Sequence, residues 1–410
     1  MLEQFNKSLD FRINTLYTGL HGMFWMLVCC TISLGSAYLS NRGYSIFSIG
    51  LLFAVAYLLA AFAQQIVSVL TDNSTEFDVL DVLAVFGVAI NIDLFIALFT
   101  HGNSFWTGIT FLFAAMITYT IQPFLNALNF HIERYGVDMN YGFARASGSF
   151  AFFIMSLIAG FFMKITSVRV VIIFGFLVSI GFTAFIIWIF RELKATGIKV
   201  KNAYDPFEHD SSDAFDTSFL KDFVEKYRMF FLFLIGVMCF FFSHVISNNF
   251  LYQIVVHVGG DEATNGGIMA VMAIVELPAM IFFTRLRDRF GTKLLLGVSA
   301  VFFLVKIFFT AISTTVPMLY FSMLFQCLAF ALFIPASVYF VDEIMTKKDA
   351  VKGQAFVTIA MTFSSLIGSI FGGLIINLLG VNAALWFAFV VTFVGVVVGI
   401  YSLFRINTQK

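Results

Sequence analysis

Long apolar runs recur along the whole chain, and short polar segments separate them. A helix needs about 20 mostly apolar residues to cross the hydrocarbon core of a bilayer. Strands of a membrane barrel would be shorter and would alternate apolar with polar positions. The pattern therefore predicts twelve membrane-spanning helices, at residues 14–39, 45–70, 79–101, 105–129, 140–163, 168–190, 229–256, 264–284, 294–313, 316–340, 353–377 and 382–404.

Composition strengthens this interpretation. Hydrophobic residues make up 60% of the 410, against about 45–50% in soluble domains. The fold class that follows is an all-α polytopic membrane protein with twelve transmembrane helices in two six-helix halves. One long polar linker divides the chain, and its acidic stretch 205–216 is typical of a disordered segment. We therefore expect a six-helix bundle at 1–190, a cytoplasmic central loop at 191–228 and a second six-helix bundle at 229–410.

The distribution of basic residues predicts the orientation. An even number of spans puts both termini on one side of the membrane. If that side is the cytoplasm, Arg42, Lys164 and Arg169 lie outside, Arg145 and Lys306 lie within spans, and the remaining 19 of the 24 basic residues lie inside. Such an excess is typical of cytoplasmic loops. We expect a multi-pass protein of the cytoplasmic membrane with both termini and the central loop in the cytoplasm.

Four charged residues fall within the predicted spans: Asp93, Arg145, Glu276 and Lys306. A charge at membrane depth costs a few kcal/mol, so each needs a partner or water. Glu276 lies mid-span and just before Pro278, which favours a functional carboxylate. Lys306 could balance Glu276 or Asp93, or belong to a coupling network. Asp93 could form a structural ion pair or bind a proton, and Arg145 could snorkel or bind substrate.

Uncharged polar residues form stripes on two spans. Gln122 and Asn126 are four residues apart in span four, and His244 and Asn248 are four apart in span seven. Residues with this spacing share a helix face. The stripes are explained by a water-filled cavity that they line, or by hydrogen bonds that hold helices together.

The two halves show weak sequence similarity at equivalent positions. Asp72 follows the second span, and the segment 286–293, which reads Leu-Arg-Asp-Arg-Phe-Gly-Thr-Lys, follows the second span of the other half. Internal repeats of this kind are typical of transporters whose binding site lies between the repeats.

The twelve spans, the cytoplasmic central loop and the segment 286–293 together make the chain resemble the major facilitator superfamily. The family's loop signature is Gly-x-x-x-Asp-Arg/Lys-x-Gly-Arg/Lys-Arg/Lys, and the chain matches it at Asp288, Arg289, Gly291 and Lys293. Thr284 stands where the first glycine would be, and the copy at Asp72 lacks the basic residues. The resemblance implies a gate in which the aspartate pairs with an arginine and accepts hydrogen bonds from a neighbouring helix N-terminus. A basic loop that fixes topology alone is the alternative.

A narrower resemblance starts at Tyr141-Gly142-Phe143-Ala144-Arg145-Ala146-Ser147-Gly148-Ser149. This stretch is similar to the start of the fifth helix in lactose permease and its oligosaccharide/proton symporter relatives. The resemblance implies that Arg145 binds sugar and that Phe152 replaces a tryptophan stacked under the sugar. It also implies that Glu276 contacts sugar and that Lys306 lies near the proton site. Asn126 stands where the relatives carry a carboxylate, and the segment 325–330 lacks their His-x-x-Glu pair.

No enzyme motif is visible in the sequence: there is no Walker loop, Gly-x-Ser-x-Gly or His-Glu-x-x-His. Selectivity-filter repeats are also missing, which disfavours a channel. The four cysteines fall within spans, so we expect no disulfide or thiolate metal site, and we also expect no cofactor. Because no nucleotide-binding domain is visible, energy must come from an ion gradient or from the substrate gradient, and titratable Glu276, Asp93 and His244 favour protons over sodium.

The sequence thus predicts a proton-coupled symporter of a sugar or oligosaccharide that works by alternating access. We expect a monomer whose partners are a small-molecule substrate and the lipid bilayer, without nucleic acid. A transporter of small organic anions, a drug or metabolite exporter, and a non-transporting receptor of the same fold are the alternatives. The candidate substrate-binding residues are Arg145, Asn126, Gln122, Glu276, His244, Asn248 and Phe152, and the candidate proton-coupling residues are Glu276, Lys306 and Asp93.

Overall fold

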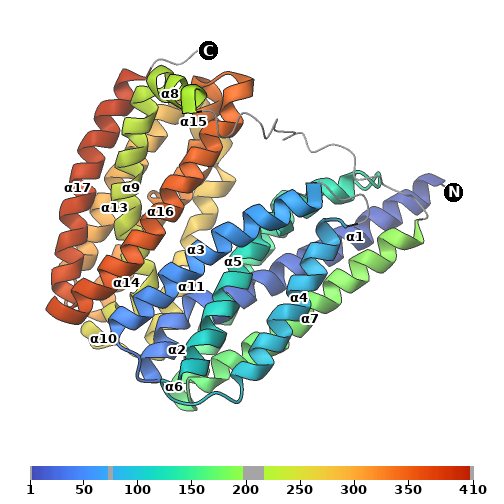
Figure 1. The fold of residues 1–410 in the computed structure, drawn as a ribbon, viewed down its shortest axis with the longest axis horizontal. Helices are drawn as coiled ribbons and strands as arrows, with labels where there is room; N and C mark the ends of the chain where they lie inside the picture. Colours follow the sequence, from blue (N-terminus) through green and yellow to red (C-terminus); the bar gives the residue numbers. More distant parts are fainter. Residues whose placement is uncertain (1, 73–76, 197–216, 407–410) are drawn as a thin grey trace. The chain divides into compact units, whose positions relative to one another are not determined.

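The structure is a computed structural model that describes residues 2–72, 77–196 and 217–406 (Figure 1). Within these ranges the regular structure is helical, and no strand is found. Twelve of the helical segments are long and apolar enough to cross a membrane. The predicted fold class and the number of spans are therefore confirmed. Of the predicted central loop, residues 197–216 lie outside the described part of the chain.

The chain divides into two compact units, and the first combines residues 1–203 with 260–274. In it α1 packs against α6 and α7, while α5 packs against α3 and α4. Its elements are α1 (Leu2–Val28), the π-helical turn η1 (Cys29–Ser33), α2 (Gly35–Asn41), α3 (Ile46–Asp72), α4 (Val79–Ala97), α5 (Phe105–Glu133), α6 (Tyr141–Ile165), α7 (Arg169–Ala195) and the first part of α11 (Glu262–Ile281).

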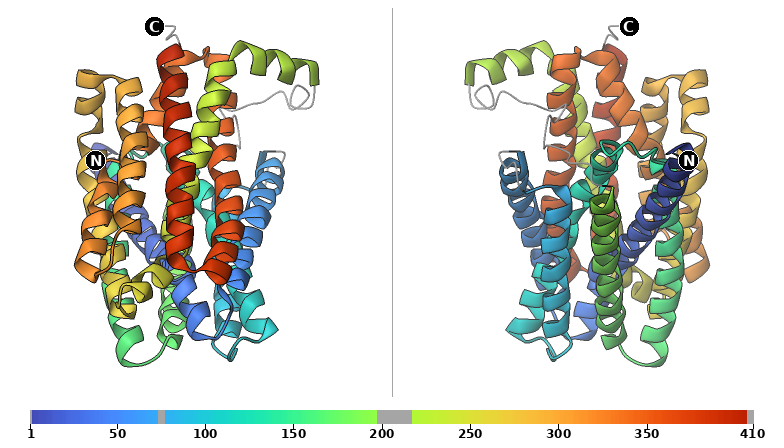
Figure 2. Two further views of the ribbon diagram at one scale, coloured as in Figure 1. Left: turned by 90° about the vertical axis from the view of Figure 1, so that its left-hand side faces the viewer. Right: turned by 90° about the vertical axis from the view of Figure 1, so that its right-hand side faces the viewer.

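The second unit combines residues 204–259 with 275–410. Figure 2 shows α9 beside α17, which are packed along much of their length. Its elements are α8 (Thr217–Lys226), α9 (Arg228–Asn249), α10 (Leu251–His257), the end of α11, α12 (Phe283–Phe290), α13 (Thr292–Ala311), α14 (Val316–Leu324), the 3-10 turn η3 (Phe325–Cys327), α15 (Phe330–Ile344), α16 (Lys347–Leu379) and α17 (Val381–Arg405).

Glycines allow the closest helix contacts in each unit. A Cβ atom on Gly236 of α9 would lie 2.8 Å from the Gly395 carbonyl oxygen and 2.8 Å from the Gly399 Cα of α17. In the first unit, a Cβ on Gly266 of α11 would lie 2.2 Å from the Ser156 carbonyl oxygen of α6. Because membrane helices gain little from hydrophobic burial against each other, such small-residue contacts favour close backbone packing.

Several spans that we expected to be continuous are interrupted. The first span covers Leu9–Ser33, and the chain then continues as the separate helix α2 instead of running straight to residue 39. The seventh is broken at Phe250, between α9 and α10. The tenth contains the 3-10 turn η3, after which the carbonyl oxygen of Ala329 accepts a hydrogen bond from Ser299 Oγ at 2.6 Å. Broken helices expose backbone groups at membrane depth, and neighbouring side chains must satisfy them.

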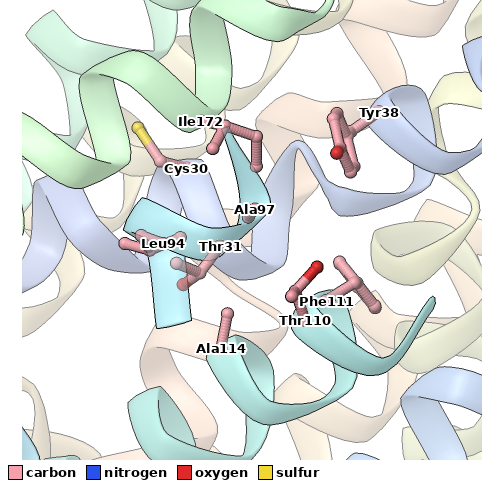
Figure 3. Close-up of a pocket in the computed structure, with 9 residues that line it drawn as sticks. All are labelled: Cys30, Thr31, Tyr38, Leu94, Ala97, Thr110, Phe111, Ala114 and Ile172. Atoms are coloured by element: carbon pink, nitrogen blue, oxygen red, sulfur yellow. The ribbon is translucent and has the colours of Figure 1, made fainter. Parts of the chain in front are cut away.

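The π-helical turn borders a small cavity in the first unit (Figure 3). Its volume is about 10 Å³, and Thr31, Thr110 and Tyr38 supply hydroxyl groups around it, among the apolar side chains of Leu94 and Phe111. A space of this size holds about one water molecule. The cavity is therefore too small to be a substrate site, although π-helical turns often accompany function.

Candidate functional site

Three side chains form a hydrogen-bonded network inside the second unit. Lys306 Nζ on α13 donates to Gln326 Oε1 at 2.6 Å, and Gln326 Nε2 donates to Glu276 Oε1 on α11 at 2.8 Å. The exposed fractions of Lys306 and Gln326 are both 2%. Burial of either charge alone is costly, whereas an ammonium and a carboxylate together leave the network neutral. The Gln326 amide therefore joins two opposite charges.

The broken tenth span puts this amide in position. Gln326 is the middle residue of η3, between α14 and α15. A turn with three residues per turn shifts the side chains that follow relative to an ideal α-helix. On the facing helix, Glu276 precedes Pro278, and the helical axis is interrupted at Phe282 before α12 begins. Gln326 and Glu276 thus both lie near irregular backbone, as is typical of midplane sites in transporters.

His244 and Asn248 of α9 form a second polar pair in this unit. Asn248 Nδ2 lies 2.9 Å from His244 Nε2, so the ring nitrogen accepts and the other nitrogen, Nδ1, carries the proton. The imidazole stacks on the Phe330 ring at a centroid distance of 4.6 Å and an interplanar angle of 6°. Among the described residues, His244 Nδ1 and Asn248 Oδ1 have no hydrogen-bond partner. The pair therefore keeps one donor and one acceptor for a ligand or water.

Arg145 lies in an aromatic cluster of the first unit. Its guanidinium carbon is 4.1 Å from the centre of the Trp25 ring, and its Nη1 donates to Ser149 Oγ at 3.1 Å. Tyr141, at the start of the same helix, donates its hydroxyl to Asn126 Oδ1 of α5 at 3.3 Å. Tyr141 and Arg145 both belong to α6, so this bond ties the helix that carries Arg145 to Asn126 of α5. The Trp25 ring stabilises the guanidinium charge through this cation–π contact.

The aromatic surface comes from one face of α1. Tyr17, His21 and Trp25 follow one another at intervals of four residues, and the Tyr17 and His21 rings meet edge to face at 4.7 Å. Trp25 in turn meets Phe152 at 6.5 Å. The exposed fraction of His21 is 0%, and neither of its ring nitrogens has a partner among the described residues.

Gly148 makes this arrangement possible. A Cβ atom at this position of α6 would lie 2.3 Å from Trp25 Cδ1 and 3.0 Å from its Nε1. A contact that short would push the indole away from its present position. The last glycine of the Tyr141–Ser149 motif therefore has a physical role, which is to admit the tryptophan from α1.

Two predicted site residues of the first unit lie apart from this cluster. Gln122 is exposed on α5. Asp93 lies on α4, where its Oδ2 is buried and has no hydrogen-bond partner among the described residues. The nearby Asn91 instead links α4 to α7, because it donates to Thr183 Oγ1 and accepts from Ser179 Oγ. Asp93 belongs to the first unit and forms no described ion pair, whereas Lys306 belongs to the second.

The predicted gating loop forms α12 and the start of α13. Asp288 pairs with Arg287 at 2.7 Å, which raises the pKa of Arg287, while Arg289 lies over the Phe290 ring. Gly291 adopts a φ of +75°, a conformation that favours glycine. Lys293 Nζ donates to the Ile406 carbonyl oxygen. No described contact joins Asp288 to a helix N-terminus. At the matching place, α3 ends at Asp72, and residues 73–76 lie outside the described part of the chain.

Sequence reasoning missed two residues that organise these clusters. We considered Gln326 only as part of a segment that departs from the permease pattern, yet it joins Glu276 to Lys306. A single glutamine in a strongly apolar span was the available signal. Trp25 was also missed, although its spacing from Tyr17 and His21 marks one helix face. In the described ranges, no group of three or more His, Cys, Asp or Glu side chains could hold a metal ion.

Twelve helices that are long and apolar enough to cross a membrane, in two compact units, define the class as a polytopic helical membrane protein. The comparison with family models identifies the family. A model described as "MFS_1 like family" matches residues 23–387, so the chain belongs to that family. The family and the fold are those of secondary membrane transporters of the major facilitator type, and they favour a protein that is not an enzyme.

Individual relatives are more distant. The chain is 28% identical over 149 residues to multidrug resistance protein 2 of Bacillus subtilis (strain 168), and the match covers 36% of each protein. Multidrug resistance protein 1 of the same organism is 30% identical over 117 residues, which is 28% of this chain and 30% of that protein. The matches thus span about a third of these relatives' lengths.

Solved structures match over nearly the whole chain. The structure of the nucleoside transporter NupG has a TM-score of 0.75 at 15% identity, with 97% of this chain and 100% of that chain covered. A bacterial homologue of the lysosomal transporter Spinster has a TM-score of 0.67 at 11% identity, with coverage of 98% and 97%. At such identities the likeness shows the fold alone.

Proposed function

We propose that this chain is a proton-coupled secondary transporter that takes up a sugar or oligosaccharide by alternating access. It acts in the cytoplasmic membrane, with both termini in the cytoplasm, and uses the proton gradient as its energy source. The observation that carries the proposal is the network of the buried Lys306 and Gln326 with the partly buried Glu276. It combines a carboxylate and an ammonium at membrane depth, and such groups are rare there without a role in transport.

Proton coupling follows from the chemistry of this network. As a carboxylate, Glu276 accepts the bond from the Gln326 amide. Once protonated, the carboxyl group becomes a donor, and the buried ammonium of Lys306 loses its balancing charge. Both changes favour a different arrangement of the three side chains, and a proton that binds one arrangement better shifts the conformational equilibrium.

The cluster around Arg145 supports a substrate rich in hydroxyl groups. A guanidinium offers several donors in a fixed fork, and the Asn126 amide both donates and accepts. Trp25, Tyr141 and Phe152 supply aromatic faces that pack against the apolar face of a sugar ring. His21 adds two ring nitrogens without a described partner.

The test begins with ligand identification. The purified protein is screened by thermal shift against mono- and oligosaccharides, because a ligand that binds the folded state raises Tm. The best sugar is then followed into vesicles that carry an imposed proton gradient. We expect Glu276→Gln to abolish accumulation of this sugar while it preserves exchange across the membrane, since an amide keeps hydrogen bonds but carries no proton.

Glu262→Gln is the matched control, because it makes the same change at the start of the same helix, where Glu262 contacts Asn41. It should leave accumulation unchanged. Full accumulation by Glu276→Gln would show that Glu276 does not carry the proton, and proton coupling would then be assigned to Asp93 or His244. A screen in which no sugar raises Tm would overturn the sugar assignment.

A drug exporter is the second candidate, since the curated relatives are named multidrug resistance proteins. The aromatic rings at Trp25 and Phe152 would also suit a planar apolar cation. The same screen separates the candidates, because apolar cations, and not sugars, would raise the Tm of an exporter of this type. A small organic anion would differ again, because neutralisation of Glu276 would strengthen its binding.

A further inference from the structure

A cavity of about 310 Å³ opens in the second unit, away from the network of Lys306, Gln326 and Glu276. It lies where α8 meets the first residues of α9 and the last residues of α17. In Figure 1, α8 is drawn at the same end of this unit as the end of α17. The residues that line the cavity include Glu225, Lys226, Tyr227, Arg228, Ile344 and Arg405. Its volume is within the range of small-ligand sites.

Two arginines dominate the charge of this cavity. The charge of Lys226 is already paired within the protein, because its Nζ lies 2.7 Å from Asp349 Oδ2. The Tyr227 hydroxyl donates to the same oxygen at 2.8 Å. Arg228 and Arg405 form no ion pair with any carboxylate in the described ranges. The Arg405 guanidinium rests over the Tyr401 ring at 4.4 Å, which leaves its edge donors available.

Glu225 is the acidic residue of the lining, and it lies farther than 4.0 Å from both guanidinium groups, since no ion pair joins them. Its charge offsets one of the arginines. Among the described residues, the lining therefore keeps a positive balance that no carboxylate offsets. Such a balance favours the binding of an anion.

The depth of the two arginines indicates which anion fits. Arg228 is the first residue of one membrane-spanning segment, and Arg405 is the last residue of another. Next to Arg405, the Phe404 ring has an exposed fraction of 74%. Basic and aromatic side chains at the ends of spans lie at the level of the lipid headgroups. The cavity is thus at the depth of phospholipid phosphates.

We propose that this cavity binds the phosphate group of an anionic phospholipid, with Arg228 and Arg405 as its ligands. Guanidinium groups suit this role, because their planar fork matches phosphate oxygens in bidentate contacts. The lipid tail would run along the apolar surface beside Phe404. The site is independent of the proposed transport function, since none of its residues belongs to the network or to the aromatic cluster.

The experiment uses the purified full chain in a neutral detergent and three soluble probes. These are dioctanoyl phosphatidylglycerol, dioctanoyl phosphatidylcholine and inorganic phosphate, each compared by thermal unfolding. We expect phosphatidylglycerol to raise Tm by about 4 °C at saturation, because it binds the folded state. Phosphatidylcholine should give no shift, since its headgroup carries no net negative charge.

Variants test whether the shift comes from the cavity. Arg228→Gln/Arg405→Gln should abolish the shift with phosphatidylglycerol. Arg191→Gln/Arg285→Gln is the matched control, because it removes two exposed arginines at other helix positions, and it should keep the full shift. Equal shifts with inorganic phosphate and phosphatidylglycerol would overturn the lipid as the source of the phosphate. No shift with phosphatidylglycerol, or a shift that persists in Arg228→Gln/Arg405→Gln, would overturn the site itself.

Discussion

The two units stabilise their intramembrane charges in different ways. In the second unit, Lys306 and Glu276 bond to opposite ends of one neutral amide, that of Gln326. In the first unit, Arg145 lies against the face of Trp25. His21, on the same face of α1 as Trp25, has no partner for either nitrogen among the described residues. One cluster is a polar chain between opposite charges, and the other is a cation within an aromatic surface.

This difference indicates different tasks. A chain that is balanced by opposite charges responds strongly when one charge is gained or lost, because burial makes an unbalanced charge costly. It is therefore suited to detect a proton. A cation–π contact stabilises the guanidinium, whose several N–H donors suit it to bind a ligand rich in hydroxyl groups. Four comparisons of variants test this division of work, and they are ordered by the size of the expected effect.

Loss of Lys306 should have the largest effect. In Lys306→Met the Glu276 carboxylate keeps its charge in the buried network without the ammonium. We expect the free energy of unfolding to fall by about 3 kcal/mol, as for other buried pairs that lose one partner. Arg145→Met in the first unit should cost about 1 kcal/mol, which is the scale of a cation–π contact. Chemical or thermal unfolding of the purified variants measures both.

A double variant sharpens this comparison. Lys306→Met/Glu276→Gln has no net charge in the network and should recover most of the lost stability, yet it should still fail to accumulate substrate. Equal stability of Lys306→Met and the unmodified protein would show that Lys306 does not balance Glu276. The second unit would then not differ from the first in the way that it stabilises its intramembrane charges.

Arg145→Lys should have the next largest effect, and on binding instead of stability. The substitution keeps the charge but removes the planar fork and its stacking on Trp25. We expect substrate affinity to fall by about tenfold, since a hydrogen bond to a charged group contributes about 1.5–3 kcal/mol. Equilibrium binding of the sugar found by thermal shift provides the measurement. Unchanged affinity would mean that Arg145 only snorkels toward the membrane surface.

The twelve spans were predictable because their signal is redundant. Most spans contain more apolar residues than are needed to mark them, so single polar residues such as Glu276 or Lys306 do not obscure them. The ends were less certain. Helices such as α1 and α5 continue beyond the apolar run into polar residues, because a helix can extend into water at no cost to its backbone hydrogen bonds.

The internal geometry of the sites was only partly predictable. Spacing marked the face shared by His244 and Asn248, and these two side chains are hydrogen-bonded. The 3-10 turn around Gln326 could not be expected, since its residues are compatible with an α-helix. The interruption depends on tertiary contacts, such as the bond from Ser299 to the carbonyl of Ala329. Pairings between distant helices depend on packing that local patterns do not encode.

A smaller effect is expected from two glycines of α6. Gly148→Ala places a methyl group 2.3 Å from Trp25 Cδ1, whereas a Cβ on Gly142 meets nothing within 4 Å. Overpacking of this kind costs about 1 kcal/mol or more. We expect Gly148→Ala to weaken sugar binding about fivefold and Gly142→Ala to leave it unchanged. Equal affinities of the two variants would remove Trp25 from the binding surface.

The smallest effect should come from an ion pair outside both clusters. Lys164 Nζ lies 2.8 Å from Asp261 Oδ2, and this hydrogen bond lowers the pKa of Asp261 from 3.8 to about 2. A carboxylate with a lowered pKa stabilises the fold above its unfolded-state pKa, and that contribution is lost as the pH falls through about 2. Between pH 5 and 8, Asp261 therefore stays ionised and contributes no pH dependence.

Asp261→Asn should accordingly leave the shape of the pH profile of sugar uptake unchanged between pH 5 and 8. Glu276→Gln should flatten the profile over the same range, because it removes the carboxyl group that we assign to the proton. Initial uptake rates into vesicles at fixed sugar concentration compare the two variants directly. A displaced profile in Asp261→Asn would show that proton sensing extends to this ion pair of the first unit, and the assignment of coupling to the second unit alone would then be wrong.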